Sequence, residues 1–196
     1  MMRDRVKAIS QLFRDKGMEV CTRIDLTSNS RQELLRLLRR FRSLYDIVSV
    51  KCMNQNAATI ACRDRRIDVV FFDPANNRAR FTHPLANLLH GTLEINLQPL
   101  LSSRNTSFNL SRIAKEASIA REHRSRVILS SGANSPLFVR GPLQLMAVGS
   151  ALGLDSEQSR SAVTDVPLAL IARNSFRRSR AFVEEGVTIV TPRAGD

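Results

Sequence analysis

The sequence predicts an α/β protein in which strands and helices alternate around a mostly parallel sheet. Apolar residues switch repeatedly between short runs typical of strands and longer helical spacings, which is the pattern of β/α units. Residues 67–72 are dense in Val, Ile and Phe without alternation, as expected of a parallel strand buried on both faces. The chain has 196 residues, 43% of them hydrophobic, and therefore suits one domain with a substantial core.

The first predicted element is a helix that Gly17 ends, because apolar residues recur at helical spacing from Val6 to Phe13. A strand over residues 19–26 follows, and the polar residues 27–30 supply a cap for an amphipathic helix over residues 31–45. The next elements are a strand over residues 47–53, a short helix over residues 57–63 and the strand over residues 67–72, which Asp73 and Pro74 end.

The second half continues the alternation. Pro84 lies near the start of a helix over residues 85–90, and a strand over residues 92–97 follows. Helical spacing over residues 107–124 precedes a fifth strand, over residues 127–129. Pro142 opens a helix that reaches residue 152, and Asp155 with Gln158 resembles a capping box for the next helix. A helix over residues 165–180, a strand over residues 187–190 and a loose tail over residues 191–196 complete a single predicted domain, residues 1–196.

Arginine dominates the charge of the chain. Thirty Lys and Arg face 18 Asp and Glu, which leaves a net charge of +12, and only four of the thirty are lysine. Such a surplus disfavours compaction unless an anionic partner offsets it, so nucleic acid is the expected partner. A genome-wide preference for arginine codons would explain the ratio of arginine to lysine, but not the net charge.

The basic residues gather in four segments, residues 36–42, 63–66, 104–126 and 173–180. On the outer helices of a barrel, such segments can line one surface and neutralise RNA phosphates. For any single arginine the alternative is a solvated helix face with internal ion pairs. The chain has nine Phe, one Tyr and no Trp, so we expect recognition by phosphate contacts and shape rather than by base stacking.

The cysteines and the N-terminus indicate the compartment. Cys21, Cys52 and Cys62 are odd in number and form no C-x-x-C pair, so we expect neither a disulfide framework nor a zinc site. Cys21 and Cys52 lie in predicted strands, where a buried structural thiol is expected. Residues 1–16 contain no apolar signal segment, and no stretch reaches the ~18 apolar residues of a membrane span. We expect a cytoplasmic protein with no membrane contact, or a nuclear or nucleolar one in a eukaryote.

The residues available for catalysis are few. The three histidines form no H-x-H or H-E-x-x-H pair, and the chain has no G-x-G-x-x-G or Walker loop. Asp25, Asp73 and Glu94 lie on or at the ends of predicted strands and could converge there. We nevertheless expect no catalytic residue and no metal site in this protein.

Residues 127–154, VILSSGANSPLFVRGPLQLMAVGSALGL, carry a specific resemblance. They resemble the signature of the archaeal and eukaryotic ribonuclease P protein component 3 family, the thirty-kilodalton subunit. In that family a strand ending in Ser-Ser-Gly-Ala precedes an Arg-x-Pro helix start and an apolar helix that closes in Gly-Leu. The segments IDVVFFDP, LEINLQPLL and SRIAKEASIAREHRSR are also similar to the family, and the match extends from about Arg23 to Asn174.

The resemblance implies a distorted TIM-like β/α barrel, related to the polymerase and histidinol phosphatase (PHP) superfamily but without its metal site. It also implies a subunit of the ribonucleoprotein that cleaves the 5′ leader from precursor tRNA. The RNA would supply catalysis and use magnesium, while this protein would bind no cofactor. The implied partners are ribonuclease P RNA, precursor tRNA indirectly, a small protein subunit and other ribonuclease P proteins.

One departure from the family concerns the first strand. Family members usually have a full β/α unit before the position of Arg23, whereas this chain begins in a charged helix. We therefore expect either that the first barrel strand is absent or that the chain is divergent or truncated. The barrel would then be incomplete, with a sheet edge that a partner could cover.

Arg112, Arg126, Arg140 and Arg173 occupy positions that are basic in the family pattern. For Arg140 the alternative is local, because it could fix the loop before its helix instead of contacting RNA. A second hypothesis for the function is a PHP-type metal-dependent phosphoesterase that uses Asp25, Asp73, His83 and Glu94. A third hypothesis is a barrel enzyme that acts on a small molecule. The expected RNA-binding residues are Arg104, Arg112, Lys115, Arg121, Arg126, Arg140, Arg173, Arg177 and Arg178.

Overall fold

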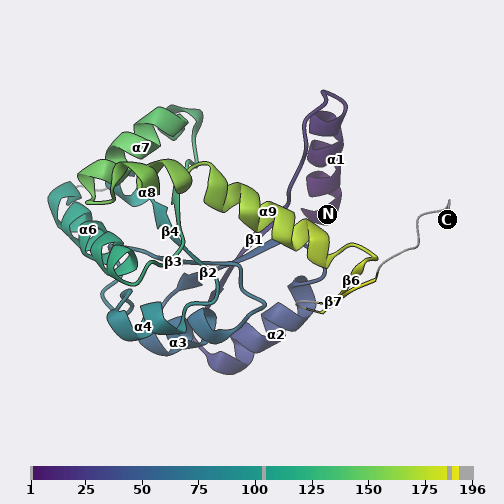
Figure 1. Ribbon diagram of the computed structural model, residues 1–196, viewed down its shortest axis with the longest axis horizontal. Coiled ribbons are helices and arrows are strands. Elements are labelled where there is room, and N and C mark those ends of the chain that lie inside the picture. The colour runs from purple at the N-terminus through teal and green to yellow at the C-terminus, as the bar shows by residue number, and fades with distance from the viewer. Residues whose placement is uncertain (1, 103–104, 185–186, 190–196) are drawn as a thin grey trace.

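The computed structural model describes residues 2–102, 105–184 and 187–189, and a five-stranded parallel sheet lies at its centre (Figure 1). The strand order β1-β2-β3-β4-β5 follows the sequence, which is the order found in the wall of a β/α barrel. The predicted fold class is confirmed. Among the described residues, β1 and β5 are the edges of an open sheet. The strands are β1 (Arg23–Ser28), β2 (Ile47–Cys52), β3 (Val69–Phe72), β4 (Thr92–Asn96) and β5 (Val127–Ser130).

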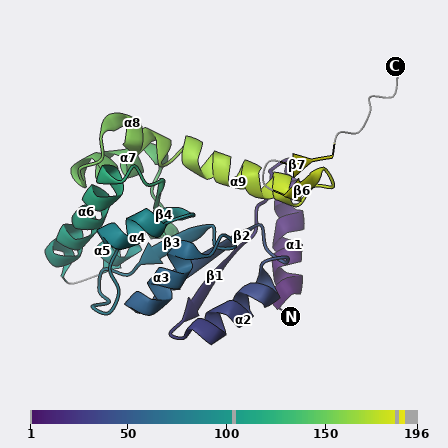
Figure 2. The same cartoon turned by 60° about the horizontal axis from the view of Figure 1, so that its bottom comes forward.

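Helices follow the strands and pack on one face of the sheet (Figures 1 and 2). The main core lies between them, where Val48, Val50 and Leu93 of the sheet pack with Leu34 and Leu38 of the first covering helix. The burial of these apolar side chains supplies the main stabilisation of this layer. The covering helices are α2 (Arg31–Phe41), α3 (Gln55–Arg63), α4 (His83–Leu88) and α6 (Thr106–Glu122), with the short α5 (Gln98–Ser102) before α6.

The opposite face of the sheet carries polar side chains. Successive strand residues point to opposite faces, so Asp25 and Ser49 face away from the apolar core that contains Leu26 and Val48. Ser49 and Glu94 are nevertheless buried on this polar face. In a closed barrel the corresponding face would be the interior.

The C-terminal third contains α7 (Pro142–Ala151), α8 (Ser156–Ser161) and α9 (Asp165–Arg177). The predicted capping box of α8 is confirmed: Asp155 Oδ1 accepts a hydrogen bond from the Gln158 amide at 2.7 Å, and Gln158 Oε1 accepts one from the Asp155 amide at 3.2 Å. From there α9 runs across the amino-terminal end of the sheet (Figure 2). This placement brings basic residues of α9 next to the loops that precede β2 and β3.

The first and last predicted strands differ most in the structure. The first strand begins at Arg23 instead of residue 19, because the amide and hydroxyl of Thr22 donate to the Asp46 carboxylate in the loop before β2. The predicted strand over residues 187–190 is short: Val187–Thr188 (β7) pairs antiparallel with Phe182–Glu184 (β6), outside the main sheet. The sequence does not predict β6, α5 or the 3-10 helix Pro136–Phe138, because these elements are too short to show a period. The predicted tail over residues 191–196 lies outside the described residues.

The charged helix at the start, α1 (Met2–Arg14), projects away from the sheet near the C-terminal end of α9 (Figures 1 and 2). Its Ile9 and Leu12 are each 57% exposed, so it buries little apolar surface against the body of the protein. Within the described part of the chain, every helix falls short of the length and hydropathy needed to cross a bilayer.

Candidate nucleic-acid interface

The sheet divides the expected RNA-binding residues into two groups. Arg112 and Arg140 lie at the carboxyl-terminal end of the strands, as shown by their contacts with the segments that follow β3 and β5. Lys115 is exposed on α6. Arg104 lies outside the described residues. The remaining members are at the amino-terminal end, in the last turn of α6, in the α6–β5 turn, and on or just after α9: Arg121, Arg126, Arg173, Arg177 and Arg178.

At the carboxyl-terminal end, Arg112 is partly buried and bound to the protein. Its Nη1 donates to the Pro74 carbonyl at 2.7 Å, and its guanidinium lies 4.3 Å from the centre of the Phe108 ring. This arrangement links α6 to the loop after β3. Arg112 therefore has a structural role whether or not it also contacts RNA.

Arg140 makes the local contacts that the sequence analysis offered as an alternative. Its Nη1 donates to the carbonyls of Leu137 and Val139, both at 2.9 Å, and so fixes the loop before α7. Carbonyl partners leave the guanidinium charge uncompensated. A contact with RNA at Arg140 stays a prediction.

The Ser-Ser-Gly segment at the end of β5 has a packing explanation. Ser130 Oγ donates to Glu94 Oε1 at 2.6 Å across the polar face of the sheet. Gly132 adopts φ +55°, and a Cβ at this position would lie 1.9 Å from Asn96 Oδ1. Only glycine combines that backbone conformation with such a close approach.

At the amino-terminal end, Arg121 and Arg126 are exposed and bind backbone carbonyls. Arg121 Nη1 donates to Gly153 O and Arg126 Nη2 to His90 O, each at 2.8 Å. Among the described residues, neither side chain has a carboxylate partner. Their positive charge therefore stays available for an anion.

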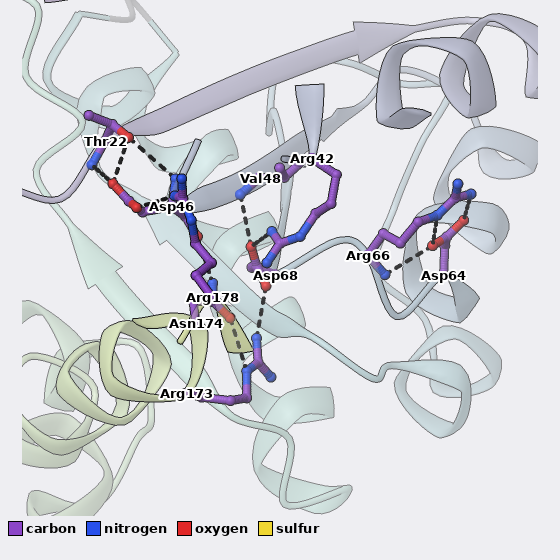
Figure 3. Close-up of polar contacts among 10 residues, drawn as sticks. All are labelled: Thr22, Arg42, Asp46, Val48, Asp64, Arg66, Asp68, Arg173, Asn174 and Arg178. Atoms are coloured by element: carbon purple, nitrogen blue, oxygen red, sulfur yellow. Dashed lines mark hydrogen bonds and ion pairs between the residues drawn. The ribbon is translucent and has the colours of Figure 1, made fainter. Parts of the chain in front are cut away.

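Arg173 is held instead by an acid (Figure 3). Its Nη2 lies 2.9 Å from Asp68 Oδ1, while Arg42, after α2, pairs with the other carboxylate oxygen, which also accepts the Val48 amide at 2.8 Å. The Asp68 side chain is fully buried. Burial lowers the pKa of Arg173, and the Asp68 carboxylate opposes that shift. This cluster anchors α9 to the start of β3.

Asp46 holds the following turn of α9 in the same way (Figure 3). It pairs with Arg178 and accepts two hydrogen bonds from Thr22, while its own carbonyl accepts Asn174 Nδ2 at 2.9 Å. Burial raises the pKa of the Asp46 carboxyl, but the Thr22 hydrogen bonds and the charge of Arg178 outweigh it and lower the pKa. Sequence reasoning missed Asp46 and Asp68 as anchors. The available signal for Asp68 was a charged residue inside an apolar run.

The acids of the phosphoesterase alternative are occupied by basic side chains. Arg23 Nε lies 2.7 Å from Asp25 and its Nη2 lies 2.5 Å from Glu94, so one guanidinium bridges the two carboxylates. Lys51 pairs with Asp73 at 2.8 Å. His83 is in the helical layer, where its Nδ1 lies 3.0 Å from Nε2 of His123. In the described part of the chain no three His, Cys, Asp or Glu side chains form a group suited to a metal ion.

One expectation about the cysteines is wrong. Cys21 is exposed in the segment before β1, since that strand begins later than predicted. Cys52 and Cys62 are buried, and burial raises the pKa of the Cys62 thiol to about 12. Both buried thiols are therefore protonated and structural.

Comparison with protein families identifies one that covers most of the chain. The family model described as RNase P subunit p30 matches residues 5–179. Ribonuclease P protein component 3 of Methanosarcina barkeri is 28% identical over 177 residues, which cover 88% of this chain and 73% of that protein. The Arabidopsis thaliana protein GAMETOPHYTE DEFECTIVE 1 is also 28% identical, over 88% of this chain and 30% of its own length. A chain of archaeal ribonuclease P, solved with mature tRNA, has a TM-score of 0.83 at 17% identity, covering 98% of this chain and 84% of that one, and so shares the fold.

Proposed function

The chain belongs to the RNase P subunit p30 family, and on that premise we propose that it binds the RNA of ribonuclease P through the arginines of α6 and the α6–β5 turn. It is a protein subunit of ribonuclease P, the holoenzyme that removes 5′ leaders from precursor tRNA. The subunit acts by holding RNA, while the RNA component supplies the catalysis and uses magnesium. The protein itself binds no cofactor in this proposal.

The observation that carries the RNA-binding proposal is the pairing of Arg121 and Arg126 with carbonyls. Both guanidinium groups are exposed and positioned by a neutral partner, so each keeps its full charge and unused N–H donors. Lys115 adds an exposed charge to α6. Phosphate oxygens of an RNA backbone match this arrangement.

The proposed partners are the ribonuclease P RNA, precursor tRNA through that RNA, a small protein subunit and other ribonuclease P proteins. An archaeal ribonuclease P chain with the same fold was solved with mature tRNA, which supports an assembly of this kind. The free cysteines are compatible with a reducing compartment, and we place the protein in the cytoplasm, or in the nucleus or nucleolus of a eukaryote.

Reconstitution tests the proposal. The full chain is added, with the ribonuclease P proteins that co-purify with it, to the ribonuclease P RNA of the same organism, and cleavage of precursor tRNA is followed at low magnesium. We expect faster cleavage with the chain than without it, and a smaller gain with the double variant Arg121→Ala, Arg126→Ala. If the chain has no affinity for the RNA and adds nothing to cleavage at any magnesium concentration, the proposal fails.

The phosphoesterase alternative is disfavoured by Arg23, whose guanidinium occupies the space between Asp25 and Glu94. A positive charge there offsets the carboxylates that a catalytic metal would need. The purified chain without RNA, assayed with a phosphodiester substrate and manganese, is expected to show no turnover. Turnover that Glu94→Gln abolishes would restore the alternative.

A further inference from the structure

Three arginine segments that are far apart in the sequence meet at the amino-terminal end of the sheet. Arg42 follows α2, Arg65 and Arg66 precede β3, and Arg177 and Arg178 end α9. Together with Ser43 and part of β6 they line a hollow of about 890 Å³. Among the described residues that line it, Glu184 is the one acid. We call this surface the arginine hollow.

Three of these arginines are each held by an acid (Figure 3). The Arg66 guanidinium makes two hydrogen bonds to Asp64, at 2.9 and 2.6 Å, and these lower the pKa of the Asp64 carboxyl. Asp68 holds Arg42, and Asp46 holds Arg178. The Asp68 and Asp64 side chains are 0% and 14% exposed, whereas those of Arg66 and Arg178 are 38% and 42% exposed. Asp46, which holds Arg178, is 33% exposed, and Arg42 is 21% exposed. In each of the three pairs the arginine side chain is therefore more exposed than the acid that holds it.

This layering suits recognition of phosphate. A guanidinium has five N–H donors in a rigid fork, and a carboxylate on one side leaves donors on the other side for a second anion. Arginine side chains that an acid already holds in place also lose less rotational freedom when a ligand binds. Arg173 shares Asp68 with Arg42, so two guanidinium groups are paired with one carboxylate there.

The basic α6–β5 turn lies on the same amino-terminal side of the sheet as the arginine hollow. Arg126, Arg177 and Arg42 all lie close enough to Arg173 for their charges to lower its pKa. Basic side chains therefore occur along the amino-terminal end of the sheet, from the turn before β5 to the loops before β2 and β3. An extended polyanion matches a surface of this extent better than a single small anion does.

We propose that the arginine hollow binds backbone phosphates of the ribonuclease P RNA, as a second contact surface distinct from the exposed face of α6. This inference rests on the proposed function, because it takes the RNA as the ligand. It assigns RNA contacts to Arg42, Arg65 and Arg66 in addition to Arg177 and Arg178.

Salt-dependent binding of the full chain to the ribonuclease P RNA transcript tests the inference. The hollow variant Arg66→Gln, Arg178→Gln is compared with the control Arg5→Gln, Arg160→Gln, which removes the same charge from exposed positions on α1 and α8. The hollow variant should flatten the slope of log K against log salt by about 1.4–1.8, which corresponds to two lost phosphate contacts. The control should leave the slope unchanged. Equal slopes in the two variants overturn the inference.

Two further variants separate RNA contact from folding. Arg66→Lys, Arg178→Lys retains the charge and should retain most of the slope, although it loses the planar fork. Ser43→Glu adds a negative charge to the exposed rim without breaking any of the ion pairs. It should weaken RNA binding at an unchanged melting temperature, whereas Ser156→Glu on α8 should not. If Ser43→Glu binds RNA like the wild type, the hollow is not an RNA site.

The result also distinguishes the two proposals. A wild-type chain that fails to bind the RNA contradicts the proposed function and this inference together. A wild-type chain that binds, with hollow variants that behave like their controls, contradicts this inference alone. The α6 surface would then carry the binding.

Discussion

Arg173 and Asp68 are 105 residues apart in the sequence, and their side chains form an ion pair of 2.9 Å at the amino-terminal end of the sheet. Asp68 is fully buried and also serves Arg42 and the Val48 amide, so three segments depend on one carboxylate. A buried acid with several partners stabilises a fold chiefly because its loss leaves those partners unsatisfied. Loss of the Asp68 carboxylate should therefore weaken the docking of α9 on the sheet.

Asp68→Asn should destabilise the protein by about 2–4 kcal/mol, since it leaves the positive charges of Arg42 and Arg173 without their acid. Arg173→Gln should cost less, because Arg42 still pairs with Asp68. Denaturant unfolding followed by circular dichroism measures both free energies. Equal costs for the two variants would show that Asp68 does not act as the shared anchor.

Glu116→Gln should stabilise the protein at high pH. Burial raises the pKa of Glu116 to about 8 from an ordinary value of 4.5, although the Phe81 amide and Arg112 act against the shift. The stability that this group contributes is therefore fully present below about pH 4.5 and is lost as pH rises toward 8. The variant should match the wild type at pH 4 and exceed it by a few kcal/mol near pH 8, at about 1.4 kcal/mol per pKa unit. Melting temperatures across this range test the prediction, and a constant difference would contradict it.

Arg23→Ala should destabilise the protein by about 2–3 kcal/mol, because Glu94 is buried, with a side chain 2% exposed, and would lose its cationic partner. Ser130 would still donate to Glu94, which limits the cost. The double variant Arg23→Ala, Glu94→Gln removes the unpaired charge as well and should recover part of the stability. A double variant that is less stable than Arg23→Ala would argue against the bridging role of this arginine.

Gly132→Ala should cost about 1–3 kcal/mol, because alanine is strained at φ +55° and its Cβ would meet the Asn96 side chain. Asn96 Oδ1 also accepts the Gln98 amide at 2.8 Å, so a displaced Asn96 loosens the start of α5. Gly141→Ala is the matched control, since a Cβ there meets no atom within 4 Å. The melting temperature of Gly132→Ala should therefore be clearly lower than that of Gly141→Ala.

Arg126→Ala should weaken RNA binding, whereas Arg112→Ala should lower the stability of the protein. Arg126 is exposed with a carbonyl partner, so its loss should lower the salt slope of RNA binding by about 0.7–0.9 at a nearly unchanged melting temperature. Arg112 links α6 to Pro74 and stacks on Phe108, so its loss should cost about 1 kcal/mol of stability. Combined unfolding and binding curves decide between the roles. A marked drop in melting temperature for Arg126→Ala would make that residue structural.

The local patterns of the sequence predicted most of the fold. The periods of the apolar residues gave five strands in their correct order, and Gly, Pro and capping residues located most helix ends. The signature over residues 127–154 indicated the family that the family model confirms. These features depend on neighbours within a few residues, so the sequence shows them directly.

The partner of each charged side chain was not predictable in this way. Charge excess and four arginine segments were visible in the sequence. That Arg42, Arg66 and Arg178 meet in one hollow, each paired with an acid, was not. Nor did the sequence show that Arg23 bridges Asp25 and Glu94, or that Cys21 lies outside a strand.

The difference between what the sequence predicted and what it did not has a physical reason. Secondary structure follows from short-range periodicity and burial, so the sequence by itself determined the β/α order, the basic character of the surface and the family signature. An ion pair such as Arg173 with Asp68 forms only after α9 packs across the sheet, and its energy depends on the burial that this packing creates. The tertiary structure therefore decided which arginines anchor the fold and which face solvent, where RNA can reach them.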